Sequence, residues 1–244
     1  MNQEIIVCEK GAVRYGRDSV VFHALDVCLK AGGFYYLTGP SGSGKSTFLK
    51  LLYLGIPLVE GRLRILGEDV RFGRSTQRAR LRQEMGIVFQ DFKLLPHLTV
   101  VENVALALRI RGLSGEKSDS QARELLAWVG VEAGERFPQE LSGGEQQRAV
   151  IARAVIARPR VIIADEPTGS LDEEVALKVM YLFEELHKLG TTVILATHHR
   201  DLTTAFPHDI LLIQDQSIVQ EGVSQTLDRP FSFSFGHHGG GVGV

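Results

Sequence analysis

Residues 39–47 read Gly39-Pro40-Ser41-Gly42-Ser43-Gly44-Lys45-Ser46-Thr47, which fits the pattern GxxxxGK[ST]. An apolar run from Phe34 to Thr38 precedes this glycine-rich turn, and a helical pattern from about Lys45 to Tyr53 follows it. Glycines let the backbone curl so that several N–H groups face inward, and the helix adds its positive end. The sequence therefore predicts a phosphate-binding loop, in which Lys45 reaches the β- and γ-phosphates of a nucleotide and Ser46 ligates Mg²⁺.

A second apolar run, Val161 to Ala164, ends in two carboxylates, Asp165 and Glu166. Charges are tolerated at the carboxyl end of a buried parallel strand because the ligand crevice opens there. Taken alone, the pattern also fits a simple strand-end cap. Paired with the phosphate-binding loop, it predicts that Asp165 holds Mg²⁺ through water and that Glu166 polarises the attacking water as general base.

Residues 141–148 read Leu141-Ser142-Gly143-Gly144-Glu145-Gln146-Gln147-Arg148. Ser142 and Glu145 have the spacing of a capping box at the start of a helix. A cap accounts neither for Gly143-Gly144 nor for the polar residues that follow. The N–H groups exposed at this helix start would form a second anion site, suited to a γ-phosphate.

The composition is that of a globular protein, with 244 residues, 44% hydrophobic and 23% charged. With 27 basic and 29 acidic residues the net charge is -2, and a basic excess is absent, so no nucleic-acid partner is expected. We interpret the basic stretch from Arg74 to Arg82 as a solvated face, and Cys8 and Cys28 as buried, reduced thiols. The start of the chain has no signal-peptide pattern, and no apolar run approaches the ~18 residues that span a bilayer. We therefore expect a cytoplasmic protein, and any membrane role must come through a partner.

Strand and helix patterns alternate along the chain, which favours an α/β fold with a mostly parallel core sheet and crossover helices. We expect short strands in the first ~35 residues and a helical insertion over about residues 91–158 within a single domain, residues 1–222. The expected helices are a Thr99-capped stretch to Ile110, Ser120 to Val129, Glu145 to Ala157 and Glu173 to Leu189. The expected later strands are Gly86 to Phe89, Val161 to Ala164, Thr191 to Ala196, Ile210 to Ile213 and Ile218 to Val219. Residues 223–244 lose periodicity and suggest a flexible tail, in which His237 and His238 fall short of a metal site.

With these motifs in this order, residues 4 to 222 resemble the ATP-binding cassette family. The resemblance implies a P-loop NTPase cassette with helices on both faces of the core sheet and an N-terminal antiparallel β subdomain. It also implies that Tyr15 stacks on adenine and that Gln90 contacts Mg²⁺ and water. His198 would touch the γ-phosphate, and Asp172, in Ser170-Leu171-Asp172, would lie at a dimer interface.

Packing for Tyr15 and a surface role for His198 remain the alternatives when each residue is taken alone. His199 stands where the family often has an acidic or amide residue, which leaves the choice between His198 and His199 open. The complete nucleotide set comprises Tyr15, residues 39–47, Gln90, Ser142, Gly143, Gly144, Glu145 and Asp172. The predicted Mg²⁺ ligands are Ser46, Gln90 and Asp165, and the predicted catalytic residues are Glu166 and His198.

The family resemblance further implies a head-to-tail homodimer with ATP between the subunits. Residues 89–96, Phe89-Gln90-Asp91-Phe92-Lys93-Leu94-Leu95-Pro96, are similar to the FtsE group of cell-division ATPases. That similarity implies an FtsX-like transmembrane subunit at the cytoplasmic face of the inner membrane and control of cell-wall hydrolases. ATPases of lipoprotein release or macrolide efflux are the alternative, and a soluble cassette acting on DNA or ribosomes is a third reading.

Overall fold

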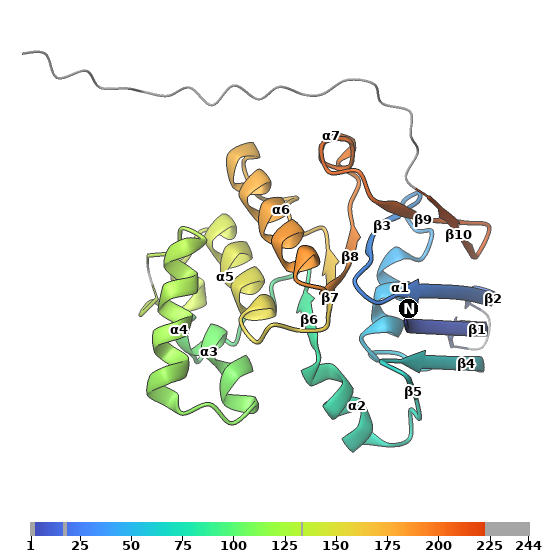
Figure 1. Ribbon diagram of the computed structural model, residues 1–244, viewed down its shortest axis with the longest axis horizontal. Helices are drawn as coiled ribbons and strands as arrows, with labels where there is room; N and C mark the ends of the chain where they lie inside the picture. Colours follow the sequence, from blue (N-terminus) through green and yellow to red (C-terminus); the bar gives the residue numbers. More distant parts are fainter. Residues whose placement is uncertain (1–2, 17–18, 133, 223–244) are drawn as a thin grey trace, which may run out of the picture.

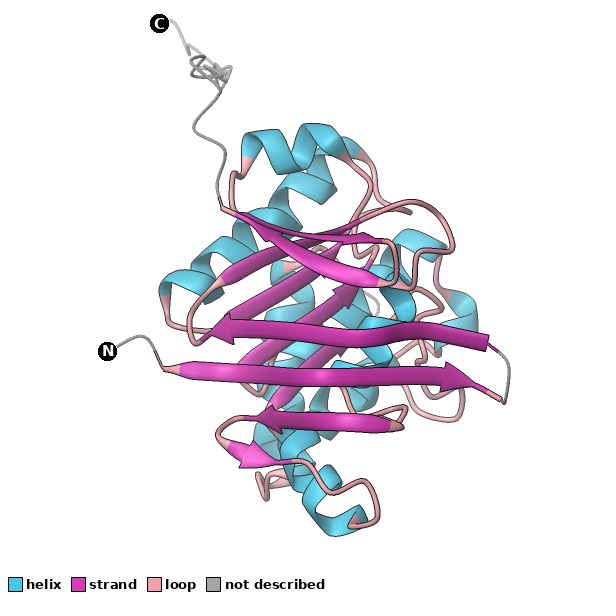
Figure 2. Ribbon diagram, turned by 90° about the vertical axis from the view of Figure 1, so that its right-hand side faces the viewer, coloured by secondary structure: helices cyan, strands magenta, loops and turns pink. Residues whose placement is uncertain are grey.

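The computed structural model describes residues 3–16, 19–132 and 134–222, which form two β-sheets with helices around them (Figures 1 and 2). The larger sheet has the strand order β10-β9-β3-β8-β7-β6. Its strands are β3 (Phe34–Thr38), β6 (Met85–Val88), β7 (Val161–Asp165), β8 (Thr192–Ala196), β9 (Asp209–Gln214) and β10 (Ser217–Glu221). Five of these strands are parallel, and β10 pairs with β9 in the antiparallel sense. The predicted α/β architecture is confirmed.

Helices cover both faces of this sheet because its central strands are apolar on both sides. Tyr35 and Leu37 of β3 join one core with α1 (Lys45–Leu52), and Phe34 and Tyr36 of the same strand join another. The second core contains residues of α5 (Gly143–Val155) and α6 (Glu173–Lys188), the yellow and orange helices of Figure 1. Because successive side chains point to opposite faces, one continuous apolar run serves both cores.

The second sheet is antiparallel and contains the N-terminal part of the chain, in the order β2-β1-β4-β5. Its strands are β1 (Glu4–Tyr15), β2 (Ser19–Lys30), β4 (Glu60–Ile65) and β5 (Glu68–Asp69). The expected short strands are in fact two strands of 12 residues each, which lie side by side in Figure 2. The pairing of β1 with β2 shifts register between Cys8 and Gly11. Such a bulge interrupts the alternation of apolar and polar residues, which suggested shorter strands, but it leaves the strand itself continuous.

The helical insertion has a core of its own, built from α3 (Val100–Ile110), α4 (Gly115–Trp128) and α5. The short helix η1 (Pro138–Glu140) leads into α5. Thr99 and Glu102 form the predicted capping box at the start of α3. Helix α4 begins five residues before the expected Ser120, because its first turn carries the polar residues Glu116 and Lys117 and lacks an apolar signal.

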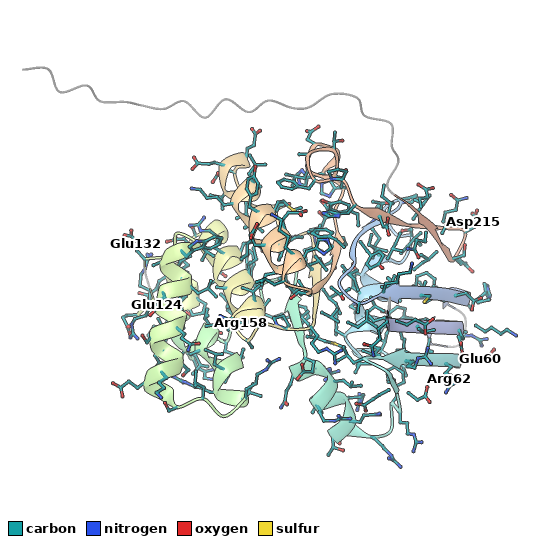
Figure 3. All side chains as sticks on the ribbon, viewed as in Figure 1. Glu60, Arg62, Glu124, Glu132, Arg158 and Asp215 are labelled. Carbon is teal, nitrogen blue, oxygen red and sulfur yellow. The ribbon has the colours of Figure 1, made fainter. Side chains whose placement is uncertain are left out.

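The sequence analysis missed β4, β5, α2 (Ser75–Gln83) and α7 (Arg200–Ala205). The first three residues of β4 are exposed, and Glu60 and Arg62 point away from the body of the molecule (Figure 3), so the strand has little apolar pattern to detect. The basic stretch of α2 is not only a solvated face, because Arg82 donates hydrogen bonds to the carbonyl oxygens of Tyr53 and Leu54.

Cys28 is exposed, so the prediction that it is buried was wrong. An antiparallel sheet can have one face in solvent, and a small apolar residue is tolerated on that face. None of the helices in the described ranges combines the length and hydrophobicity that a bilayer crossing requires. The tail prediction, residues 223–244 with His237 and His238, lies outside the described residues, and the domain limits stay a prediction.

Candidate nucleotide-binding site

The glycine-rich turn lies between β3 and α1, as predicted. Gly39 and Gly44 have φ of 146° and 107°, in the region that favours glycine. A Cβ atom at Gly39 would lie 2.7 Å from the carbonyl oxygen of Ile213, and one at Gly44 would lie 2.8 Å from Cγ1 of Val21. Both the backbone conformation and the space around it therefore require glycine at these two positions.

Helix α1 begins at Lys45 with no side-chain cap, so the N–H groups of its first turn are open to an anion. Nζ of Lys45 donates to the carbonyl oxygens of Gly39 and Pro40 at 2.7 and 2.9 Å, which holds the cation over the loop. Oγ of Ser43 is buried and has no hydrogen-bond partner within the described residues. The loop thus presents backbone donors, a cation and an unpaired hydroxyl to one small volume, the set that a polyphosphate would occupy.

Tyr15, at the end of β1, lies beside the glycine-rich turn. Its phenolic oxygen accepts a hydrogen bond from Oγ1 of Thr47 at 3.5 Å, and 43% of the residue is exposed. An exposed ring at the start of α1 is available for stacking on a planar base. Tyr15 thus lies next to residues 39–47, as stacking on a bound base requires. A role in packing alone would not require this position.

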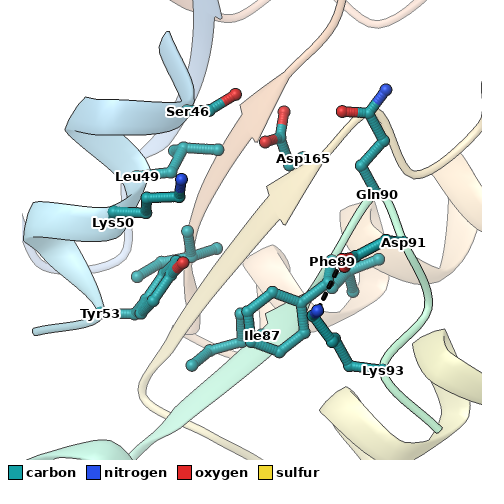
Figure 4. Close-up of a pocket in the computed structure, with 12 residues that line it drawn as sticks. Ser46, Leu49, Lys50, Tyr53, Ile87, Phe89, Gln90, Asp91, Lys93 and Asp165 are labelled. Atoms are coloured by element: carbon teal, nitrogen blue, oxygen red, sulfur yellow. Dashed lines mark ion pairs between the residues drawn. The ribbon is translucent and has the colours of Figure 1, made fainter. Parts of the chain in front are cut away.

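Three oxygen-bearing side chains converge at the carboxyl ends of the core strands (Figure 4). They are the hydroxyl of Ser46, the carboxylate of Asp165 and the amide of Gln90, and they line a cavity of about 370 Å³. Burial raises the pKa of Asp165, and the adjacent Glu166 raises it further, while a hydrogen bond from Ser46 opposes this shift. Hydroxyl, carboxylate and amide oxygens are the hard ligands that Mg²⁺ prefers, so this set fits the ion that the sequence predicted.

Glu166 and His198 are brought into contact because β7 and β8 are neighbours in the sheet. Oε1 of Glu166 lies 2.8 Å from Nδ1 of His198. Oε2 of Glu166 is buried without a partner within the described residues. Glu166 has a φ of 48°, an uncommon conformation for this residue type that is held by its N–H bond to Ala196. The pair combines a free carboxylate acceptor with an imidazole that is 72% exposed, which can accept and hold a proton.

The start of α5 carries the predicted capping box. The backbone N–H of Ser142 donates to Oε2 of Glu145 at 2.9 Å, and the backbone N–H of Glu145 donates to Oγ of Ser142 at 3.3 Å. The Ser142 hydroxyl also donates to Oε2 of Glu145 at 2.7 Å, and this bond lowers the pKa of Glu145 most, followed by the bond from the Ser142 backbone N–H and by the nearby Arg136. Gly143, in contrast, has ordinary helical backbone, and a Cβ atom there would meet nothing within 4 Å. Nothing in the described part of the chain therefore requires glycine at position 143.

Residues 142–145 at the start of α5 and the glycine-rich turn, residues 39–47, form two separate groups. Among the described residues, no hydrogen bond or ion pair joins residues 142–145 to residues 39–47. Asp172 is the N-cap of α6, with its Oδ1 accepting from the N–H of Val175 at 2.9 Å. A single copy thus supplies the predicted residues in two groups, one around Lys45 and one around Ser142.

Sequence reasoning missed the contacts of two polar residues on α5, the buried Gln147 and the partly exposed Arg153. Arg153 donates to the carbonyl oxygens of Phe92 and Lys93, at 3.0 and 2.6 Å. Nε2 of Gln147 donates to the carbonyl oxygen of Pro167, directly after Glu166, at 2.9 Å. The signal was a polar residue facing the core side of an otherwise apolar helix face, but the partners are backbone groups that no sequence pattern identifies.

Comparisons with known proteins agree with this geometry. Residues 22–169 match the family model described as ABC transporter. The chain is 38% identical to the cell division ATP-binding protein FtsE of Streptococcus pneumoniae, over 85% of this chain and 91% of that protein. It is 39% identical to the glutamine transport ATP-binding protein GlnQ of Escherichia coli, over 85% and 87%.

Among solved structures, a dimeric post-hydrolysis state of the ATP-binding cassette MJ0796, bound to ADP and Pi, is similar with a TM-score of 0.84. That likeness has 31% sequence identity and covers 90% of this chain and 99% of the other. The chain therefore belongs to the ABC transporter family and is an ATP-binding, ATP-hydrolysing cassette.

Proposed function

We propose that two copies of the chain close head to tail on two ATP molecules, each held between residues 39–47 of one copy and residues 142–145 of the other. The observation that carries this proposal is Gly143. Gly143 is the first residue of α5, and neither its backbone nor its surroundings in one chain requires a residue without a side chain. A close approach by a group from outside the chain explains the glycine, and an N-terminal helix turn favours an anionic group. The similarity to a dimeric cassette supports the same arrangement.

In this dimer the chain's residues have separate tasks. Lys45 and the N–H groups of the glycine-rich turn bind the phosphates, and Tyr15 stacks on the base. Mg²⁺, when bound by Ser46, Asp165 and Gln90, neutralises charge on the β- and γ-phosphates. Oε2 of Glu166 accepts a proton from the attacking water, since it is the unpaired acceptor of that carboxylate.

His198 holds the other oxygen of Glu166 and faces outward, where a γ-phosphate would lie. Ser142, Gly143 and Gly144 of the partner copy donate to that phosphate, and Asp172 lies at the interface. Binding the γ-phosphate on both sides favours the closed dimer, and its loss on hydrolysis releases the copies.

We further propose that this dimer is the ATPase of an FtsEX-type membrane complex that controls cell-wall hydrolases during division. Support comes from FtsE proteins of several bacteria, 38 to 41% identical to this chain over most of their length. An FtsX-like subunit would dock beside residues 90–96, which connect the Mg²⁺ site at Gln90 with the helical insertion. Closure of the dimer would move residues 90–96, and this movement would be transmitted to the membrane partner.

A second candidate is the ATPase of an amino-acid transporter, favoured by the similarity to GlnQ at 39% identity and to the arginine transport protein ArtP at 35%. The two candidates differ in the membrane partner. Purification of the tagged chain from detergent-solubilised membranes should recover an FtsX-like protein under the first and a solute permease under the second. Pro96→Glu places a charge on the proposed docking segment, and Pro57→Glu is the matched control on another exposed loop. Loss of the partner with Pro57→Glu as much as with Pro96→Glu would contradict the docking site.

A further inference from the structure

We propose that Glu166, His198 and His199 form a binding site for a zinc-class divalent ion, separate from the Mg²⁺ site at Ser46 and Asp165. Each of the three residues offers one ligand atom, and these atoms all lie within 4.8 Å of one another. Glu166 follows β7 and the two histidines follow β8, so the cluster is assembled by the same strand pairing that brings Glu166 to His198.

The distances suit a shared ion. Zinc binds imidazole nitrogen and carboxylate oxygen at about 2.0–2.2 Å, so two ligand atoms of a tetrahedral site lie roughly 3.4 Å apart. Nδ1 of His198 is already 2.8 Å from Oε1 of Glu166. The rings of His198 and His199 are stacked, with centroids 4.6 Å apart and an angle of 28° between their planes. His199 is partly exposed, so its ring has room to turn toward an ion bound by the other two residues.

The ligand chemistry selects the ion. Two imidazoles and one carboxylate are the protein ligands of three-ligand zinc sites that leave one position to water. Imidazole is a poor ligand for Mg²⁺, which prefers the all-oxygen set of Ser46, Asp165 and Gln90. The two sites therefore divide the ions between them, and physiological Mg²⁺ does not compete at the histidines.

An ion at this site would inhibit ATP turnover. It would bind Oε1 of Glu166 and Nδ1 of His198, which lowers the basicity of the carboxylate toward the attacking water and holds the His198 ring away from the γ-phosphate. This consequence rests on the proposed function, whereas ion binding itself does not. His199 is the residue that adds the second imidazole, so it determines whether the site exists.

The site is tested on the nucleotide-free, full-length protein with Co²⁺ as a spectroscopic probe. His237→Ala and His238→Ala are present throughout, so that the tail histidines cannot contribute. We expect a visible absorption band of Co²⁺ in a low-coordinate nitrogen–oxygen site, displaced by one equivalent of Zn²⁺. His199→Asn should weaken Co²⁺ binding more than tenfold, because replacing even a residue that only hydrogen-bonds to a metal ligand lowers metal affinity about 10–100-fold. His97→Asn, at an exposed histidine elsewhere, should leave binding unchanged. A spectrum of fully hydrated Co²⁺, or equal binding by His199→Asn and its parent, would overturn the site.

Turnover provides the second measurement. With Mg-ATP in large excess, so that metal–nucleotide complexes are the same in every sample, Zn²⁺ should inhibit the parent at more than tenfold lower concentration than His199→Asn. Zn²⁺ binding seen by spectroscopy without inhibition would keep the site and contradict the role of Glu166 as general base. Inhibition that is identical in both proteins would overturn the inhibitory role of the site.

Discussion

Replacing Arg153 with Met tests whether α5 positions the segment that carries Gln90. The guanidinium of Arg153 donates to the carbonyl oxygens of Phe92 and Lys93, and burial lowers its pKa. Phe92 and Lys93 have φ of 60° and 53°, so this turn adopts a conformation that needs support from elsewhere. Methionine keeps the apolar stem of the side chain and removes both donors.

The expected cost follows from the two lost bonds. A hydrogen bond to a charged group contributes about 1.5–3 kcal/mol; the bond to Phe92 is partly buried, whereas the bond to Lys93 is exposed, so water replaces that donor in part. Because the turn can relax toward solvent, we expect about 2–4 kcal/mol in total rather than the full sum. For a chain of this size, each kcal/mol lowers Tm by about 2–4 °C, which gives a fall of roughly 4–16 °C.

Thermal unfolding by circular dichroism measures this fall, and ATP turnover measures the effect on the Gln90 segment. Turnover should decrease while ATP affinity is retained, because Arg153 contacts none of residues 39–47 in the described structure. Arg123→Met is the matched control, since among the described residues that arginine forms an exposed ion pair with Glu135 alone, which is worth under ~1 kcal/mol. Equal Tm and turnover for Arg153→Met and the parent protein would refute the inference that Arg153 holds the turn at Phe92 and Lys93 in place.

Three further predictions concern binding, stability and pH. Lys45→Ala should weaken ATP binding by roughly 10- to 150-fold, the equivalent of one lost charged hydrogen bond, and unchanged affinity in calorimetry would contradict the phosphate site. Thr99→Ala removes the capping-box acceptor of α3 and should lower the free energy of unfolding by about 0.5–2 kcal/mol in urea titrations, with no change if the cap is not formed. Burial raises the pKa of Asp165 above its ordinary value of 3.8, so Mg²⁺-dependent ATP binding should weaken as pH falls, at a higher pH than an ordinary aspartate would cause. Asp165→Asn should remove that pH dependence, and a dependence that persists would assign it to another group.

Elements with strong local signals could be predicted from the sequence. The α3 helix ends at the expected Ile110 because a capping box opens it and an apolar stripe continues through it. The core strands β7 and β8 were found within one residue because parallel strands buried on both faces are continuous apolar runs. Helix α2 was missed because Leu81 is its only buried residue, which leaves no apolar periodicity to detect.

The features of the candidate site likewise comprise some that could be predicted from the sequence and others that could not. The glycine-rich turn was predictable because its function needs particular residues at fixed spacing, and its conformation is local. The contact between Glu166 and His198 depends on β7 lying next to β8, which spacing alone does not give. The contacts of Arg153 and Gln147 end on backbone carbonyls, so their partners have no signature in the side-chain sequence.

The central claim is that ATP holds two copies together through Gly143. The most direct measurement is size-exclusion chromatography with light scattering on Glu166→Gln, which should hydrolyse about 10²- to 10⁴-fold more slowly and so retain its ATP. We predict a shift from the 26.9 kDa monomer to about twice that mass only when Mg-ATP is present. Adding Gly143→Asp should abolish the shift without harming the monomer, because a new side chain there meets nothing within 4 Å. A protein that binds ATP yet stays monomeric, or that dimerises equally well with Gly143→Asp, would contradict the account.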